Sequence, residues 1–349
     1  MERVLVTGAG GFIGGRIVER LRSEPGVEAI AMVRSYKGCA RVARLGVQMV
    51  RCDITDRSEL SKVVRNATSV IHCAMSDGPS IVDGTRNIIE CAQSAGVGKV
   101  VHLSTGDIYS AATGSLEEDS ARDRVGDWYS DAKREAEDIC EEAIGKGLPI
   151  TRLRPGIVYG PFCYAWTQRI GMRIANRQVS LLPEVQNGIC NAVFVDDVVE
   201  ACALFRRPGF GDGDAFNING PERISWNEYF LEFAAALEVA PPKPASAGRT
   251  TVKSALLEPA RTTARWLLKR YQKQIMAIYA RSSIANRLMK RMEGAFRATP
   301  EARELGVYSR RGELSDRRLR NTFPRMERTQ LRSGLKICAE YLKVFGLVE

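Results

Sequence analysis

The stretch VLVTGAGGFIGGRIVERL, residues 4–21, constrains this chain more than any other feature. It joins an apolar run typical of a buried strand to an amphipathic segment through Gly8, Gly11 and Gly14. In a strand-to-helix turn, such glycines permit the tight turn, let a pyrophosphate approach the backbone and let the helix lie close to the strand. The helix N-terminus then offers unpaired N–H groups to phosphate. The motif therefore predicts dinucleotide binding in an α/β fold.

Short apolar runs alternate with helical patterns over the first 160 residues. Their continuous Val, Ile and Leu content is typical of strands buried on both faces, as in RVLVTG, AIAMVR, VQMVRCD, SVIHCA, KVVHLST and PITRLRPG. The alternation predicts a Rossmann-type, doubly wound parallel sheet over residues 1–160, to which elements near 190–205 and 214–219 return. We expect residues 161–349 to build most of a smaller C-terminal substrate-binding lobe.

The formal charge of +10 is concentrated in one segment. Residues 1–260 hold 30 Lys and Arg against 33 Asp and Glu, whereas residues 261–332 hold 19 against 6. Within 261–300, apolar residues recur at helical spacing between basic ones, which predicts a basic helical segment. We expect it to pack on the protein itself or on a second copy; an anionic membrane surface is possible but not favoured. No nucleic-acid-binding signature accompanies it, so nucleic acid is not expected as a partner.

Composition excludes several other classes. No apolar run reaches the roughly 18 residues of a membrane span, and the N-terminus reads as a strand and a turn, so we expect a cytoplasmic protein. The nine cysteines include no C-x-x-C pair. His72 and His102 each end an apolar run and are interpreted as packing residues, so no metal site is predicted.

The end of the second predicted strand bears on the choice of cofactor. An NAD site usually carries an acidic residue there to bind the adenine ribose, but this chain has Arg34, followed by Ser35 and Lys37. A guanidinium suits a 2′-phosphate, which favours NADP(H) over NAD(H); an enzyme that accepts either cofactor is the alternative. Asp53, after the third strand, is placed to accept a hydrogen bond from the adenine amino group.

Tyr129 and Lys133 are four residues apart and therefore share one helix face. A phenol with a pKa of about 10 is a poor base at neutral pH, and a nearby ammonium stabilises its phenolate. The pair suits proton transfer to or from a carbinol oxygen while a hydride moves at its carbon. It opens the helix between the fifth and sixth predicted strands of a dinucleotide fold, which favours a catalytic role.

Taken together, the sequence resembles the extended short-chain dehydrogenases/reductases of the NAD-dependent epimerase/dehydratase family. The matching blocks follow in order as TGAGGFIG, CDITD, VIHCA, GTRNIIECA, VVHLSTGDIYS, YSDAKREAE, LRPGIVYGP and FVDDVVEA. The resemblance implies that Thr105 holds the substrate oxygen beside Tyr129, that Lys133 also binds the nicotinamide ribose, and that Pro155 to Val158 line the nicotinamide ring. Neighbouring positions of the same blocks complete the expected cofactor site: Phe12, Ile13, Ile54, Cys73 and Ala74. The resemblance also implies a homodimer through the helices that carry GTRNIIECA and YSDAKREAE.

Two departures from the family pattern narrow the expected activity. Gly106 and Asp107 stand where sugar-nucleotide dehydratases carry an acidic pair, and no Arg precedes FVDD to bind a substrate diphosphate. Our first hypothesis is therefore a reductase or dehydrogenase acting on a ketone or secondary alcohol with exchangeable NADP(H). The alternatives are a nucleotide-sugar epimerase that retains NAD, and a non-catalytic scaffold that binds a dinucleotide.

Overall fold

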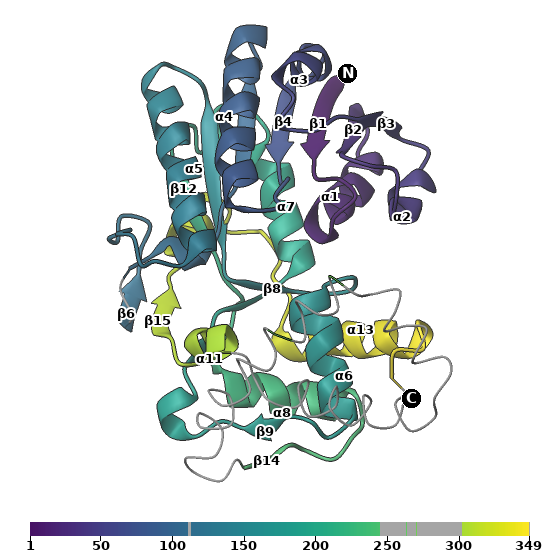
Figure 1. Cartoon of the computed structure of the whole chain (residues 1–349), viewed down its shortest axis with the longest axis vertical. Helices are drawn as coiled ribbons and strands as arrows, with labels where there is room; N and C mark the ends of the chain where they lie inside the picture. Colours follow the sequence, from purple (N-terminus) through teal and green to yellow (C-terminus); the bar gives the residue numbers. More distant parts are fainter. Residues whose placement is uncertain (111–112, 245–262, 264–269, 271–301, 349) are drawn as a thin grey trace. The chain divides into compact units, whose positions relative to one another are not determined.

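The computed structural model describes residues 1–110, 113–244, 263, 270 and 302–348 (Figure 1). A parallel sheet of seven strands has the order β12-β7-β5-β4-β1-β2-β3. The six N-terminal apolar runs form strands of this sheet, and the predicted Rossmann-type fold is confirmed. Its strands are β1 (Glu2–Thr7), β2 (Val27–Val33), β3 (Gln48–Arg51), β4 (Ser69–His72), β5 (Lys99–Leu103), β7 (Ile150–Pro155) and β12 (Ala215–Ile218).

The chain divides into two compact units, and unit 1 comprises Met1–Cys163, Asn191–Glu222 and Gly312–Gln330. Helices connect its parallel strands because the crossover from one strand to the next needs an element that returns along the sheet. The connecting helices are α1 (Phe12–Arg22), α2 (Ala40–Ala43), α3 (Arg57–Val64), α4 (Gly78–Ala95), α5 (Trp128–Gly145) and α7 (Val195–Phe205). Unit 1 also contains the short helices η1 (Gly106–Ile108) and α12 (Arg317–Thr322).

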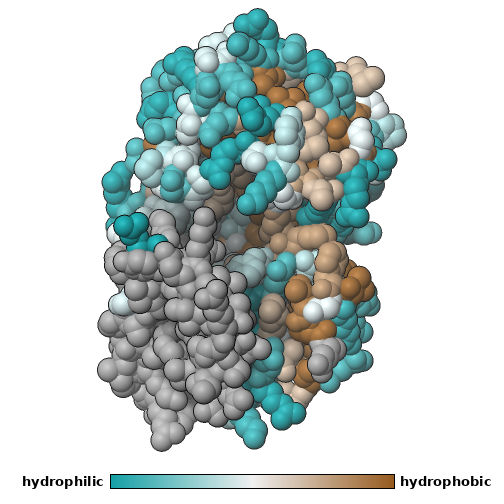
Figure 2. Space-filling model, turned by 45° about the vertical axis from the view of Figure 1, so that its right-hand side comes forward, coloured by the Kyte–Doolittle hydropathy of each residue, from teal (hydrophilic) through white to brown (hydrophobic). Residues whose placement is uncertain are grey.

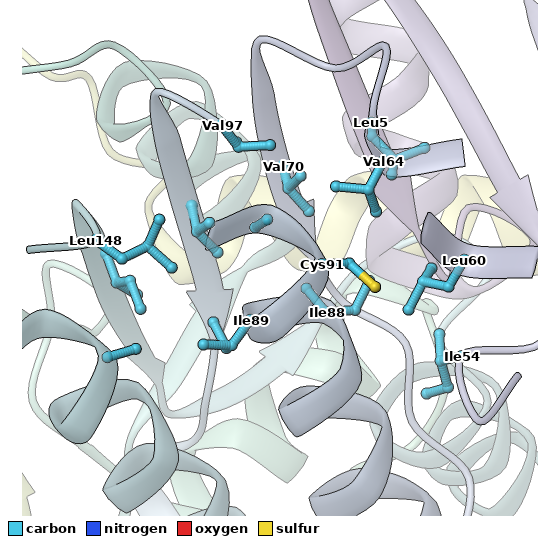
Figure 3. Packing of buried hydrophobic residues seen from close by; sticks show 14 of the residues in the cluster. Leu5, Ile54, Leu60, Val64, Val70, Ile88, Ile89, Cys91, Val97 and Leu148 are labelled. Carbon is cyan, nitrogen blue, oxygen red and sulfur yellow. The ribbon is translucent and has the colours of Figure 1, made fainter. Parts of the chain in front are cut away.

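A buried apolar cluster fills one side of the sheet, between the strands and α3, α4 and α5 (Figure 3). Leu5, Val70 and Val100 come from three neighbouring strands, and Ile88 and Cys91 from α4; all are at most 4% exposed. Buried apolar side chains occur on both faces of these strands, which is why their sequences read as continuous apolar runs. The core fixes the carboxyl ends of β1, β4 and β5 along one edge.

Two small pairings extend unit 1 beyond the main sheet. Strand β8 (Ile157–Tyr159) pairs in parallel with β11 (Ala192–Phe194), and β6 (Thr113–Leu116) pairs with β15 (Arg311–Leu314). The β15 pairing draws Gly312–Gln330 into unit 1, a return to this unit for which the sequence carries no specific signal. The side chain of Asn191 explains the capture, because it accepts from the Leu314 amide and donates to the Gly312 carbonyl.

Unit 2 comprises Tyr164–Cys190, Arg223–Arg311 and Leu331–Glu349. In its described part, the aromatic side chains of Trp226, Tyr229, Phe233 and Tyr308 are all buried, and the Trp226 and Tyr308 rings lie 4.6 Å apart. Its elements are η2 (Tyr164–Gln168), α6 (Arg169–Ala175), β9 (Ser180–Leu181), η3 (Glu184–Gln186), β10 (Ile189–Cys190), β13 (Ile224–Ser225), α8 (Trp226–Ala236), β14 (Lys243–Pro244), α11 (Ala302–Tyr308) and α13 (Leu331–Val344).

The predicted basic helical segment, 261–300, lies almost entirely outside the described residues. Among those that are described, no helix combines the length and apolarity needed to span a membrane. The described surface in Figure 2 mixes hydrophilic residues with smaller hydrophobic groups. In unit 1, large apolar side chains that are more than one-third exposed include Tyr36, Met75 and Trp128.

Candidate active site

The glycine turn after β1 has the geometry that its sequence predicts. Gly8 adopts a φ of 67°, a left-handed conformation that favours glycine. A Cβ atom on Gly14 would lie 2.4 Å from the Gly8 carbonyl oxygen, so only glycine lets α1 begin this close to the turn. Gly11 is the N-cap of α1, with no side-chain cap and no acidic residue in the first turn. The turn therefore fits a pyrophosphate, which would accept from the free amides at this helix end.

Thr7, the last residue of β1, joins this turn to the one that follows β4. Its Oγ1 accepts from the amides of Cys73 and Ala74, both at 3.1 Å, which leaves its proton for Nδ1 of His72 at 2.8 Å. His72 Nε2 then donates to Thr85 on α4, at 3.2 Å. Burial lowers the pKa of His72 to about 3, so the ring is neutral and works as a fixed hydrogen-bonding bridge.

Two segments that are predicted to bind the cofactor, the glycine turn after β1 and the turn after β4, are therefore held against each other. A Cβ on Gly8 would lie 2.9 Å from both the amide nitrogen and the Cα of Ala74. The two turns are thus in direct backbone contact, and Thr7 holds the second in place. Phe12 and Ile13, in the first turn of α1, are half-buried beside the glycine turn.

Arg34 follows β2 and is exposed, as a residue that binds a ligand phosphate must be. Its charge helps to lower the pKa of Asp77, whose main cause is a hydrogen bond with Ser80 at the start of α4. The Arg34 charge therefore acts on a carboxylate that the sequence did not indicate. Asp53 Oδ1 accepts from the amide and hydroxyl of Thr55, which shapes the turn after β3. The Ile54 side chain packs in the core against Gly84 of α4.

Tyr129 and Lys133 lie in the first two turns of α5, which Asp127 caps by accepting from the Ser130 amide at 3.1 Å. The half-buried Tyr129 is near the positive end of the helix dipole, which favours a phenolate. Lys133 is 4% exposed, and its Nζ donates to the Leu103 carbonyl at 2.7 Å. Burial lowers the pKa of Lys133 to about 8. The ammonium is thus held at the end of β5.

Thr105 follows β5 and caps the short helix η1. It is buried, and its Oγ1 accepts from the Asp107 amide at 3.2 Å, so its own proton is directed elsewhere. Gly106 packs against Leu314 of β15, whose Cδ1 would lie 2.5 Å from a Cβ at that position. A side chain of the neighbouring strand β15 therefore fills the space beside Gly106, the position at which sugar-nucleotide dehydratases carry the first residue of their acidic pair.

Pro155 ends β7, and Val158 lies in β8, where it is 9% exposed. Gly156 between them donates to the Ile218 carbonyl at 3.0 Å. Its Cβ position is filled by the Asn191 carbonyl oxygen at 2.2 Å, so the chain turns closely over β11 and β12 here. This places the predicted nicotinamide segment at the carboxyl end of β7, next to β5, the strand that Thr105 follows.

The fold thus places all the predicted site segments at the carboxyl edge of the sheet, on the loops and helix starts that follow β1 to β5 and β7. Sequence reasoning missed Thr7 and Asp77. The helix-capping pattern of Asp77 before Gly78-Pro79 could have located Asp77, but not the effect of the Arg34 charge on it. Among the described residues, no cluster of His, Cys, Asp and Glu is arranged to hold a metal ion.

The comparisons with known proteins agree with this geometry. Residues 4–218 match the family model described as "NAD dependent epimerase/dehydratase family". A dTDP-4-dehydro-6-deoxy-D-allose reductase from a Streptomyces species is 31% identical over 186 residues, 45% of this chain and 56% of that protein. A 2-alkyl-3-oxoalkanoate reductase from Stenotrophomonas maltophilia is 27% identical over 254 residues, 67% of this chain and 76% of that protein.

Solved structures give the same fold. UDP-glucose 4-epimerase from Thermotoga maritima matches with a TM-score of 0.71 at 19% identity, over 98% of this chain and 99% of that one. A dTDP-glucose 4,6-dehydratase from Bacillus anthracis, in complex with NAD, reaches 0.73 at 16% identity, over 99% and 97%. The chain belongs to the NAD-dependent epimerase/dehydratase family, as predicted. It is an enzyme of the extended short-chain dehydrogenase/reductase type, with a nicotinamide dinucleotide as cofactor.

Proposed function

We propose that this enzyme reduces a ketone to a secondary alcohol, or catalyses the reverse oxidation, with Tyr129 as general acid and base. The observation that carries the proposal is the start of α5, where Tyr129 lies one turn from a buried, cationic Lys133. The bound nicotinamide supplies or accepts a hydride at the substrate carbon. Thr105 holds the substrate oxygen by donating its hydroxyl proton, and Tyr129 gives that oxygen a proton as the carbonyl is reduced. Lys133 stabilises the phenolate that remains.

A single reduction is favoured over dehydration and over nucleotide-sugar epimerisation. Leu314 fills the space beside Gly106, so no acid is available there for elimination of water. Asn191, two residues before Val193, is engaged with Leu314, Gly312 and Asn219. Asn191 lies in the region where many epimerases carry the arginine that binds a substrate diphosphate. A non-catalytic scaffold is disfavoured because it has no chemical need for Thr105, Tyr129 and Lys133 together.

An apolar substrate is supported by the side chains around Tyr129. Trp128 is 52% exposed, and its ring lies edge-on to the Tyr129 ring at 5.8 Å. A Cβ atom on Gly78, at the start of α4, would lie 3.8 Å from the Trp128 ring, and Met75 on the preceding loop is 52% exposed. The 2-alkyl-3-oxoalkanoate reductase, whose name describes an alkyl ketone substrate, aligns over 67% of this chain. We therefore propose alkyl or aryl ketones as the substrate class.

NADP(H) is the proposed cofactor, supported by the exposed Arg34 after β2. A homodimer stays a prediction: four of the exposed residues on α4 and α5 are charged, namely Asp83, Arg86, Asp138 and Glu142, so a dimer through these helices would have to pair these charges. A cytoplasmic location also stays a prediction. Both can be measured, by light scattering of the purified protein and by fractionation of the source cells.

The decisive experiment is a substrate screen with oxidation of NADPH followed at the reduced-nicotinamide absorbance. We expect turnover with hydrophobic ketones, its abolition in Tyr129→Phe, and a raised KM in Trp128→Ala. Turnover of nucleotide sugars, together with cofactor that survives dialysis, would instead support the epimerase. Equal activity of Tyr129→Phe and the unaltered enzyme would refute the assigned mechanism.

A further inference from the structure

Glu137 lies on α5 one turn beyond Lys133 and is fully buried. Its carboxylate accepts from Nε and Nη2 of Arg154, at 2.9 and 2.6 Å, and from Nη1 of Arg122 at 3.0 Å. Burial by itself would raise the pKa of this carboxyl, but the hydrogen bonds and charge of Arg154 bring the pKa below its usual value. Glu137 is therefore a carboxylate held in the interior by arginines.

The same Arg154 continues to the loop that carries Thr105. Its Nη1 donates to the Tyr109 hydroxyl at 2.9 Å and to the Glu118 carbonyl at 2.7 Å. Tyr109 directly follows η1, and its hydroxyl donates in turn to Asn217 on β12. Arg154 itself precedes Pro155 at the end of β7. One buried guanidinium thus connects the three segments that bear the predicted site residues: α5, the loop after β5, and the end of β7.

This arrangement needs a reason, because a buried ion pair adds little net stability compared with apolar packing of the same volume. Apolar side chains would fill the same space, but they would not fix the orientation of α5 relative to β7. A bidentate pair between Arg154 and Glu137 holds α5 at one angle and one rotation relative to β7. The part of α5 so fixed is the turn that follows Lys133.

Glu137 also governs the charge around the Lys133 ammonium. Cys73, Glu137 and Cys140 each favour the cationic form, against the larger effect of burial. Burial raises the pKa values of both thiols, that of Cys73 to about 12, so neither is ionised near neutral pH. His72 and His102 also face Lys133, and both are neutral because burial lowers their pKa values. Glu137 is left as the ionised group of this set that favours the ammonium.

We propose that Glu137 is a positioning residue of the proton-transfer site: through Arg154 it aligns Tyr129 and Lys133 with the Thr105 loop, and its charge keeps Lys133 cationic. The inference rests on the proposed function, since it assigns Lys133 a role in proton transfer. It predicts two separable effects of removing the charge. Loss of the alignment should lower kcat at every pH. Loss of the positive charge on Lys133 should lower kcat on the alkaline side of the pH profile.

The test compares Glu137→Gln with Glu141→Gln. Glu141 lies one turn further along α5, also pairs with Arg122 and Arg152, and is outside the set of groups that act on Lys133. In ketone reduction, we expect Glu137→Gln to move the alkaline limb of the kcat profile to lower pH by about one unit, and so to lower kcat about fivefold at pH 8 and about tenfold well above it. Glu141→Gln should leave the limb in place. A limb unchanged in Glu137→Gln overturns the proposal.

A second readout does not depend on activity. In protein labelled with ¹³C at the lysine ε position, the Lys133 signal, assigned by its loss in Lys133→Met, should titrate near pH 8. Glu137→Gln should lower that midpoint, and Glu141→Gln should not. If the midpoint moves but the unaltered enzyme reduces no ketone, the proposed function fails and the electrostatic role of Glu137 stands. If the fold is weakened and the midpoint does not move, Glu137 is merely structural.

Arg122→Gln covers the case in which Glu137→Gln does not fold. The Arg122 side chain is 24% exposed, and its removal leaves the Glu137 pair with Arg154 intact. Loss of this cation strengthens the influence of Glu137 on Lys133, so the Lys133 midpoint and the alkaline limb should both move to higher pH. A shift in the opposite direction, or no shift, would contradict the proposal.

Discussion

Replacing Thr7 by valine keeps the shape of a fully buried side chain but removes the hydroxyl that joins β1 to the turn after β4. The amides of Cys73 and Ala74 then lose an acceptor at 3.1 Å, and His72 Nδ1 loses a donor at 2.8 Å. A buried polar group left without a partner costs about 1–3 kcal/mol, and partial relaxation reduces the sum. We expect the free energy of unfolding to fall by about 3–5 kcal/mol.

Thr151→Val is the matched control. Thr151 is also fully buried in a strand of the same sheet, β7, but its hydroxyl donates mainly to one carbonyl, that of Gly211, at 2.7 Å. Its replacement should cost about 1 kcal/mol. Urea unfolding followed by circular dichroism measures both values. Because Ala74 abuts Gly8, Thr7→Val should also weaken dinucleotide binding, by about tenfold if 1.4 kcal/mol of preorganisation is lost; Thr151→Val should not.

Two results would refute this reasoning. One is a Thr7→Val protein no less stable than Thr151→Val, with unchanged cofactor affinity. The other is a ¹⁵N spectrum of His72 that shows the proton on Nδ1 in the unaltered protein. The hydrogen bonds to Thr7 and Thr85 require it on Nε2.

Three further predictions follow from single charged or titrating groups. Arg34→Ala should weaken NADPH binding about 10- to 150-fold, the loss of one charge-assisted contact of about 1.5–3 kcal/mol, and leave NADH binding within about twofold; fluorescence titration showing equal losses would contradict the NADP assignment. His102, whose ring nitrogens have no hydrogen-bond partner within the described part of the chain, stays neutral in the fold because burial lowers its pKa. Unfolding therefore takes up a proton below pH 6.5, so the free energy of unfolding should decrease as the pH is lowered below 6.5. The decrease should be steeper in the unaltered protein than in His102→Leu, by about 1.4 kcal/mol per pH unit. Burial raises the pKa of Asp197 to about 6, so its favourable contribution is present below about pH 4 and is lost as the pH rises through 6. Asp197→Asn, which can still accept from Thr329, should therefore stabilise the protein by about 1–3 kcal/mol above pH 7, with no gain at pH 4.

Much of the fold could be predicted because its signals are local. The apolar runs that became β1 to β5 and β7 owe their conformation to residue type and spacing, and the glycine turn to steric limits within a few residues. The return of Gly312–Gln330 to unit 1 had no local signal, because the pairing partner of β15, β6, is some 200 residues earlier in the chain. No periodicity within that stretch indicates which edge it joins.

The candidate site divides in the same way. Tyr129 and Lys133 share a helix face by spacing alone, and the sequence therefore determined the chemistry that this protein can offer to a carbonyl and a dinucleotide. The tertiary structure decided what surrounds that chemistry: Thr7 meets His72, the Arg34 charge acts on Asp77, and Glu137 meets Arg154. These partners lie 17 to 65 residues apart. They meet because parallel strands joined by crossover helices bring their carboxyl ends together at one edge, where burial gives each contact its strength.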